Sequence, residues 1–395
     1  MSGLWRLVVL VLALLLPPDA VAQAFAVDRP MRVVFLNALP SDNPWRDNVL
    51  GTLRAAANDL RIELTVLSVG HWPGEVLERA REVMSGPGRP DYVLLTMHRG
   101  IGARLLELSK REKVPIFVIN SGLLPADAGR LGGPRGHFPL WLGQMVPDEA
   151  LAGRTLARLL LEASTRSRPP RASVRLVALE GRLEDASGLG RSEGLLQAVD
   201  EWEGAELLQK VSASWAVDAA WRKAELLLLR YPGLQVIWAA NDNMALGALR
   251  AVEASGRRPG QDVVLGGMDW TPEALRAVHE GRLVASLGGH FLEGAWALVL
   301  LYDHHHGRDF VSEGLDWRTS LLPVSRANVD AVLAWLGEGD WEAIDFRAFS
   351  KVANPSLTHY DFSLRALFLQ RHRRFPGLLL ESYGFTRPLP AKRTP

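Results

Sequence analysis

The segment of residues 236–249 constrains the fold of this chain more than any other. An apolar run typical of a buried strand, VIWAA, ends at Asn241 and Asp242, and a helical pattern begins directly afterwards. In a parallel α/β sheet, the carboxyl ends of the strands form the edge at which small ligands bind. The segment therefore predicts a parallel sheet with a polar, ligand-binding edge.

The same alternation of strand-like and helical patterns continues on both sides of this segment. The predicted strands are residues 31–36, 62–67, 92–95, 114–119, 174–178, 205–211, 236–239 and 262–265. An amphipathic helical pattern follows most of these runs, as in sheets of the α/β class. We predict two doubly wound, parallel-sheet lobes joined by a hinge, with the first crossing near residues 143–146.

The chain is expected to consist of a signal peptide, two lobes and a C-terminal tail. The expected parts are a signal peptide at 1–24, an N-terminal lobe at 30–144 plus 290–315, a C-terminal lobe at 145–289 plus 316–330, and a C-terminal extension at 331–395. The extension follows both lobes in the sequence. We expect it to pack on a lobe, and the alternative is a surface for a partner.

The amino terminus has the features of a cleavable export signal. A basic residue precedes an apolar run at residues 7–16, and a proline pair and the small residues Ala20 and Ala22 follow. The run is shorter than the ~20 apolar residues that span a membrane. We expect cleavage after Ala22 or Ala24 and no membrane insertion of the mature chain.

Composition excludes several further classes. The chain has no cysteine, so it forms no disulfide and carries no thiol nucleophile or lipid-bearing cysteine. This fits a periplasmic protein, although the lack of cysteine alone would also fit a cytosolic one. A net charge of +1 offers no broad field for nucleic acid.

Motifs of enzymes and metal sites are also missing from the sequence. The run Gly190-Arg191-Ser192-Glu193-Gly194 lies inside a predicted helix, residues 188–199, and is therefore no Gly-x-Ser-x-Gly elbow at a strand end. The sequence contains no Gly-Lys-Ser/Thr and no His-Glu-x-x-His, so we expect neither an enzyme nor a cofactor. The run His304-His305-His306 invites a metal site, but adjacent histidines point in different directions on a helix. A surface helix end is the better interpretation.

Polar residues follow several predicted strands in order: Asn43 before Trp45, Asn120 before Ser121, then Arg191, Asn241 and Asp269. In this order and spacing they resemble the type I periplasmic binding proteins, the ribose-binding-like group of sugar receptors. The likeness covers residues 31–324. The turn at Asn43 and Trp45 is similar to the family's Asn-Pro-aromatic turn, in which the amide holds a hydroxyl and the ring stacks on the sugar. Asn120 and Ser121 end a strand where sugar receptors often have Asp-Arg, so the usual charged grip is replaced by a neutral pair.

The second half carries the rest of the resemblance. Arg191 matches the family's arginine at a helix start, Asn241 its Asn-Asp junction, and Asp269 its Gly-x-Asp turn. Trp215 falls where the family keeps another stacking ring. His290 follows glycines where the family often has a hinge-strand glutamine. The expected ligand-binding residues are therefore Asn43, Trp45, Asn120, Ser121, Arg191, Trp215, Asn241, Asp269 and His290.

Each of these residues also has a purely structural interpretation. The tryptophans can be core aromatics, and Arg191 can serve a surface ion pair or a helix start. Asp242 fits a helix cap or interlobe contact better than a ligand group. His98 and Arg99 lie at the predicted edge, where ligand contact and plain solvent exposure are equally compatible.

The resemblance implies a monomeric, exported protein that captures a sugar-like small molecule between its lobes for an ABC permease. The alternative is a receptor that signals to a membrane sensor kinase, because the autoinducer-binding relatives are also similar. Repressors of the lactose-repressor type share the two-lobed fold but begin with a helix-turn-helix. An export signal stands in that place here.

Overall fold

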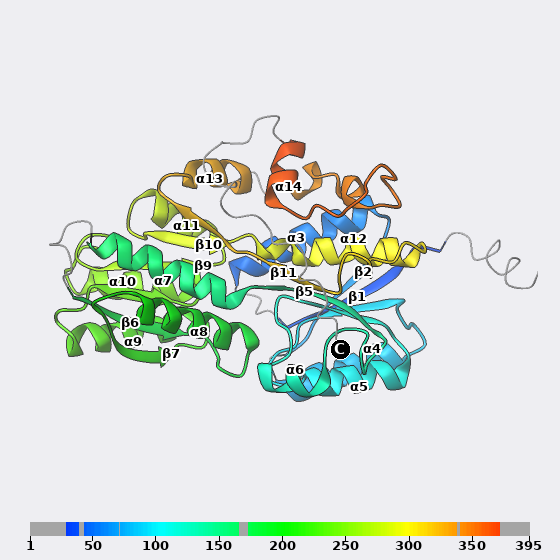
Figure 1. Ribbon diagram of the computed structural model, residues 1–395, viewed down its shortest axis with the longest axis horizontal. Helices are drawn as coiled ribbons and strands as arrows, with labels where there is room; N and C mark the ends of the chain where they lie inside the picture. The colour runs from blue at the N-terminus through cyan, green and yellow to red at the C-terminus, as the bar shows by residue number, and fades with distance from the viewer. Residues whose placement is uncertain (1–28, 39–42, 71, 166–172, 338–339, 372–395) are drawn as a thin grey trace, which may run out of the picture.

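The computed structural model describes residues 29–38, 43–70, 72–165, 173–337 and 340–371. The predicted signal peptide lies outside these ranges. Two α/β lobes stand side by side, and the last part of the described chain runs along one edge of both (Figure 1). The predicted fold class of two doubly wound lobes is confirmed.

The first lobe is built on a six-stranded sheet in which all described pairings are parallel. Its strand order is β11-β5-β4-β3-β1-β2. The strands are β1 (Arg32–Asn37), β2 (Glu63–Ser68), β3 (Tyr92–Leu95), β4 (Ile116–Ile119), β5 (Trp141–Pro147) and β11 (Asp316–Thr319).

The second lobe repeats this winding, with the strand order β12-β10-β9-β8-β6-β7. Only its edge strand β12 pairs antiparallel. The strands are β6 (Val174–Glu180), β7 (Ala205–Ser212), β8 (Val236–Ala239), β9 (Val264–Met268), β10 (Ala285–Gly288) and β12 (Leu322–Ser325).

Helices cover both sheets. Those of the first lobe are α3 (Pro44–Asp59), α4 (Pro73–Ser85), α5 (Gly102–Glu112), α6 (Pro125–Leu131), the 3-10 turn η1 (His290–Leu292) and α12 (Glu293–His305). Those of the second lobe are α7 (Glu149–Thr165), α8 (Ala186–Glu201), α9 (Val217–Arg230), α10 (Asp242–Ala254) and α11 (Pro272–His279). Figure 1 shows α3 and α12 on one face of the first sheet and α4, α5 and α6 on the other.

Burial on both faces explains the continuous apolar strands. The central strands β3, β4 and β8 are buried along their whole length, whereas the edge strands β2 and β7 alternate with exposed positions. A parallel sheet with helices on both sides demands this pattern. The apolar runs seen in the sequence are therefore the sheet interiors.

Two expected boundaries differ from the structure. Residues 143–146, where we expected the first crossing, belong to the buried strand β5, which pairs between β4 and β11 and continues to Pro147. Residues 316–330, expected in the second lobe, are divided: β11 extends the first sheet and β12 the second. Both differences arise from strand pairing: β5 continues to Pro147 between β4 and β11, and β11 joins the first sheet as its edge strand.

The C-terminal extension consists of short elements held by aromatic side chains. They are α13 (Val329–Gly337), η2 (Trp341–Ala343), η3 (Phe346–Phe349) and α14 (Leu364–Arg371). The indole of Trp296 on α12 is surrounded by rings of the extension, with centroid distances of 5.4 Å to Phe346, 4.7 Å to Phe349 and 5.1 Å to Phe362. As expected, this part of the chain packs on a lobe.

A buried carboxylate on α12 anchors the same segment. Asp303 is fully buried and accepts hydrogen bonds from the Ser350 hydroxyl (2.5 Å), the Lys351 amide (2.7 Å), the Val352 amide (3.2 Å) and the Tyr360 hydroxyl (2.9 Å). Four donors on one carboxylate compensate the cost of burying its charge.

We expect Asp303→Ala to lower the free energy of unfolding by about 3 kcal/mol, because several buried donors lose their acceptor at once. Denaturant unfolding measures the change. The matched control is Asp361→Ala in the extension, where an exposed carboxylate accepts one hydrogen bond, from the Ser363 amide. The control should stay within about 0.5 kcal/mol of the parent. Equal stability of the two variants would contradict the anchoring role of Asp303.

Candidate functional site

A cavity of about 710 Å³ lies between the two lobes, at the carboxyl ends of their strands. It has the size of a small-molecule site. All nine residues expected from the sequence to bind a ligand line it: Asn43, Trp45, Asn120, Ser121, Arg191, Trp215, Asn241, Asp269 and His290. The structure thus brings them together, and their contact with a ligand remains a prediction.

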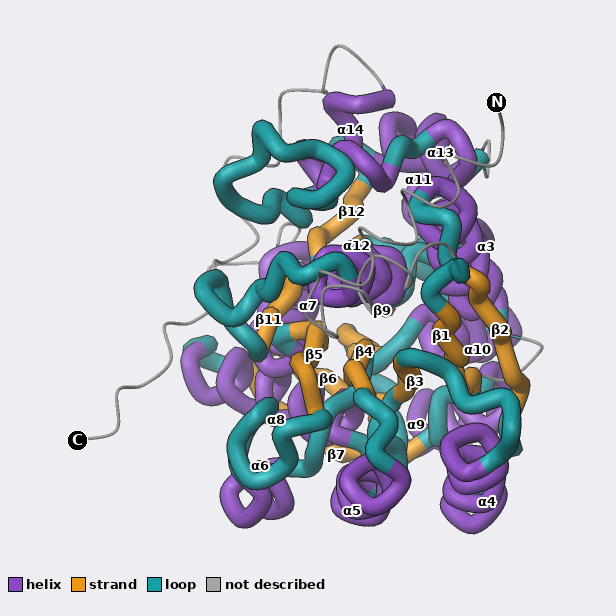
Figure 2. The backbone as a smooth tube through the Cα atoms, turned by 90° about the vertical axis from the view of Figure 1, so that its right-hand side faces the viewer, coloured by secondary structure: helices purple, strands orange, loops and turns teal. Residues whose placement is uncertain are grey.

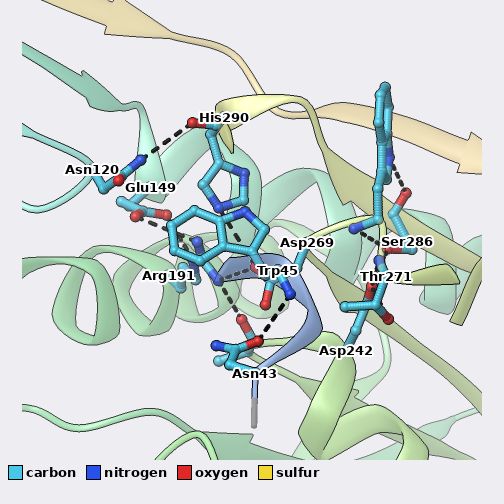
Figure 3. A network of polar contacts seen from close by, with 12 residues as sticks. Asn43, Trp45, Asn120, Glu149, Arg191, Asp242, Asp269, Thr271, Ser286 and His290 are labelled. Atoms are coloured by element: carbon cyan, nitrogen blue, oxygen red, sulfur yellow. Dashed lines mark hydrogen bonds and ion pairs between the residues drawn. The ribbon is translucent and has the colours of Figure 1, made fainter. Parts of the chain in front are cut away.

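The first wall is the turn into α3. The Asn43 side chain caps the helix by accepting from the Trp45 amide at 3.1 Å, and Pro44 occupies the first helical position, where it needs no hydrogen-bond partner. The capped turn fixes the Trp45 indole, which stacks on the His290 imidazole with a centroid distance of 4.8 Å (Figure 3).

The end of β4 supplies the next polar groups. Asn120 has a φ of 60°, in the left-handed region. Its backbone amide and its side-chain amide both donate to a carboxylate oxygen of Glu293, at 3.0 and 2.7 Å. Glu293 is fully buried, which raises the pKa of its carboxyl well above the ordinary value. The side-chain NH2 of Asn120 therefore already has a protein partner, Glu293.

Arg191 is the only arginine among the buried polar residues of the described chain. Its guanidinium donates to Glu149 at 2.6 Å and to the Ala240 carbonyl at 2.6 Å, and lies 3.8 Å from Asp269 (Figure 3). Burial alone would lower the pKa of Arg191, but the charges of Glu149 and Asp269 raise it. Arg191 is a fixed cation on the cleft wall.

Two carboxyls of the second lobe lie close to this cation. Burial raises the pKa of Asp269 to about 7 against the lowering effect of Arg191. Burial and the charge of Asp269 likewise raise the pKa of Asp242 to about 7. Asp269 has a φ of 127°, which is strained for a residue other than glycine and turns its side chain toward the cleft.

Asp242 has a structural role, as the sequence indicated. Its carboxyl accepts from the Thr271 amide at 2.8 Å and from the Ser286 hydroxyl at 2.8 Å, and it does not line the cavity. It therefore joins the start of α10 to the ends of β9 and β10. Its neighbour Asn241 caps α10 through the Met244 amide at 2.9 Å and does line the cavity.

His290 stands at the hinge between β10 and α12. Burial, followed by the charge of Arg191, lowers the pKa of its imidazole to about 3. The ring is therefore neutral at physiological pH. Its Nε2 lies 3.5 Å from an Asp269 oxygen.

Trp215 forms the opposite aromatic wall. It lies in a loop with a φ of 70°, donates from Nε1 to Asp185 at 3.2 Å, and has the Arg191 guanidinium 5.6 Å from its ring centroid. A Cβ on Gly181 would overlap its indole, so the ring needs a glycine beside it. Its polar contacts distinguish it from a core aromatic.

Sequence reasoning missed residues that become important only through the fold. Glu149 holds Arg191, and Asp185 of the second lobe accepts from the Arg99 amide of the first lobe at 3.1 Å. The lobes are therefore in contact across the cleft. Asp185 follows β6 by a few residues, so its place after a strand end was the available signal. Glu149 was missed because we expected the first crossing near residues 143–146, inside β5, and predicted no strand there.

Five buried polar atoms on residues lining the cavity find no hydrogen-bond partner within the described chain. They are Trp45 Nε1, Thr96 Oγ1, Asn120 Oδ1, Ser121 Oγ and His290 Nδ1. Buried polar groups are almost always partnered in folded proteins. Five of these atoms lie on residues around this one cavity, and further atoms of the same kind lie elsewhere in the described chain.

The histidine run lies away from the cavity. His304 and His305 are the last two residues of α12. The Nδ1 atoms of their rings lie 3.0 and 3.4 Å, respectively, from the Tyr92 hydroxyl. In the described residues, no group of three histidine, aspartate or glutamate side chains is placed to hold a metal ion. None of the described helices is long and apolar enough to cross a membrane.

The family described as a periplasmic binding protein domain matches residues 33–309. The chain is 23% identical to the ribose import binding protein of Salmonella typhimurium, over 71% of this chain and 86% of that protein. It is 19% identical to the galactofuranose-binding protein of Escherichia coli, over 72% and 84%. A periplasmic sugar-binding protein from Pseudomonas fluorescens superposes with a TM-score of 0.76 at 33% identity, over 86% of this chain and 99% of that one.

The family match spans well over half of the chain, and both lobes have the doubly wound topology that the resemblance implies. The chain belongs to the type I periplasmic binding proteins, in their ribose-binding-like group.

Proposed function

We propose that this protein is an exported periplasmic receptor that captures a neutral sugar or sugar-like molecule between its lobes and delivers it to an ABC importer. The observation that carries the proposal is the set of five buried, unpartnered polar atoms around a cavity that also contains two tryptophans. A sugar offers hydroxyls around its rim and apolar C–H faces above and below it. Such a ligand matches both features of the cavity.

The electrostatics of the cleft favour a ligand without net charge. Arg191 is already paired with Glu149 and lies beside Asp269, and His290 is neutral. An anion would meet a cation that is already compensated, and a cation would find no unpaired buried carboxylate among these groups. A neutral hydroxyl can accept from an arginine and donate to a carboxylate at once.

The proposed partner and location come from the relatives. A relative named as an import binding protein supports delivery to an importer, and the family match with the amino-terminal sequence pattern supports the periplasm after signal cleavage. Deleting the gene and measuring uptake of the radiolabelled ligand tests this. Loss of uptake is expected; normal uptake with loss of ligand-induced transcription would favour signalling to a sensor kinase instead.

The binding claim is tested with mature protein that has been unfolded and refolded to strip ligand. Melting temperature and tryptophan fluorescence are followed across pentoses, hexoses, polyols and furanoses. We expect a saturable response to one chemical group of sugars, because Trp45 and Trp215 line the cavity. No response from folded protein to any of them would contradict a sugar ligand.

We expect Ser121→Ala to weaken binding of the responding sugar about tenfold, the effect of losing one hydrogen bond of ~1.4 kcal/mol. Its stability should stay unchanged or rise, because the hydroxyl has no partner in the described protein. Titration calorimetry and denaturant unfolding measure the two effects.

The matched control is Ser109→Ala in the same lobe, where the hydroxyl donates to the Val114 carbonyl at 2.7 Å. This variant should lose stability and keep its affinity. The reverse pattern in the two variants would remove Ser121 from the binding site.

We expect the His290 imidazole to stay neutral between pH 5 and pH 8, because its folded pKa is lowered to about 3. The unfolded chain takes up this proton near pH ~6.5. The stability that His290 contributes is therefore full above pH ~6.5 and is lost as the pH falls toward 3. Ring chemical shifts of His290 by NMR check this, with the urea-unfolded protein as control; titration near pH 6.5 in the folded state would contradict it.

A further inference from the structure

The chain passes between the two lobes at the ends of strands of the sheets and once more in the C-terminal extension. Three connections join the sheets in the described chain: after Pro147, at Gly289 between β10 and η1, and at Ser320 between β11 and β12. The extension adds a fourth passage, because α13 and the elements after it lie on different lobes. Figures 1 and 2 both place α13 and α14 on the side of the molecule opposite α4 and α5.

Helix α13 belongs to the second lobe. It follows β12 closely and packs on α11 of that lobe. Its residue Asp330 lies 2.7 Å from the His279 ring of α11. Helix α13 is therefore attached to the second lobe.

The part of the extension from Trp341 onward is attached to the first lobe. The Phe346 amide donates to Asp59 of α3 at 2.7 Å. A Cβ on Gly51 of α3 would overlap the Trp341 indole, so this ring lies directly on the backbone of α3. The aromatic contacts to Trp296 and the hydrogen bonds to Asp303 continue the attachment along α12. This segment is therefore attached to the first lobe.

The two parts of the extension meet over the hinge. Trp335 of α13 is buried and stacks on Phe368 at 4.5 Å, and its centroid is 5.5 Å from that of Trp341. Phe291, next to His290, contacts Trp335 and Trp341 at centroid distances of 6.4 and 5.4 Å. These contacts join the second-lobe helix to the first-lobe segment.

A further contact reaches the hinge backbone itself. Gly289 has a φ of 105°, and a Cβ built on it would lie 2.9 Å from Leu364 Cδ1. Leu364 begins α14 and is fully buried. The hinge segment that carries His290 into the cleft is thus packed against the extension.

We propose that the C-terminal extension is a brace across the hinge that limits how far the lobes open and holds His290 in place. Gly337 and Trp341 are four residues apart, so their Cα atoms can separate by at most about 14 Å. Opening beyond a small angle must break the packing of Trp335 against Trp341 and Phe368. The brace is a property of the hinge and does not depend on which ligand the cleft takes.

The test compares distances across the cleft in ligand-free protein. Arg81 on α4 and Leu226 on α9 are exposed, and the chain has no native cysteine, so Arg81→Cys and Leu226→Cys accept one spin label each. Double electron–electron resonance then gives the distance distribution between the lobes. In this background, Trp335→Ala should move the distribution to longer distances and widen it.

The control is Phe349→Ala, which removes a contact with Trp296 inside the first lobe and leaves the hinge cluster intact. It should lower the melting temperature without changing the distance distribution. An unchanged distribution in Trp335→Ala, or equal widening in Phe349→Ala, would overturn the proposal. If Trp335→Ala does not fold, Leu364→Ala decides by the same two criteria.

Discussion

The ion pair between Arg191 and Glu149 is the interaction on which the second lobe's half of the site depends. Burying a guanidinium is costly unless it is paired and hydrogen-bonded, and here Glu149, Asp269 and the Ala240 carbonyl supply its partners. The pair links α7 to α8, and a Cβ on Gly194 would overlap the Ala150 backbone, so the two helices pack closely at this point. Arg191 in turn stands over Trp215 and beside Asp269, so their positions follow from the pair.

The first lobe contributes side chains to the cavity that lack hydrogen-bond partners within the described chain. Thr96 and Ser121 each carry a hydroxyl that has no hydrogen-bond partner within the described chain, and both residues line the cavity. The paired charges of Arg191 and Glu149 thus lie across the cavity from hydroxyls that have no protein partner in the described chain. Because each unmet hydrogen bond has a cost, the proposed polar ligand would stabilise this arrangement of the lobes by supplying the missing partners.

Much of this organisation could be predicted from the sequence. Apolar runs ending in Asn241, Asn120 and Asp269 mark strand ends at the cleft, since parallel strands share one carboxyl edge. The roles of Glu149 and Asp185 could not be predicted, because their partners lie far away in sequence and only the packed lobes bring them together. The lobe boundaries differ from the expected ones for a related reason: the places of β5 and β11 in the first sheet depend on pairing between segments far apart in the sequence.

The contacts of the C-terminal extension could also be predicted only in part. Its tryptophans and phenylalanines indicated a packed segment, but that Trp335 and Trp341 belong to opposite lobes follows only from the structure. Together with Phe291 they link the tail of the chain to the hinge and, through His290, to the cleft.

The most direct test of the central claim is a crystal structure of the protein with the sugar that stabilises it most. The account predicts one sugar in the interlobe cavity, with ligand oxygens within about 3.2 Å of Thr96 Oγ1 and Ser121 Oγ and an indole of Trp45 or Trp215 against a C–H face. A sugar bound elsewhere, or bound in the cleft while these hydroxyls remain without ligand contacts, would contradict it.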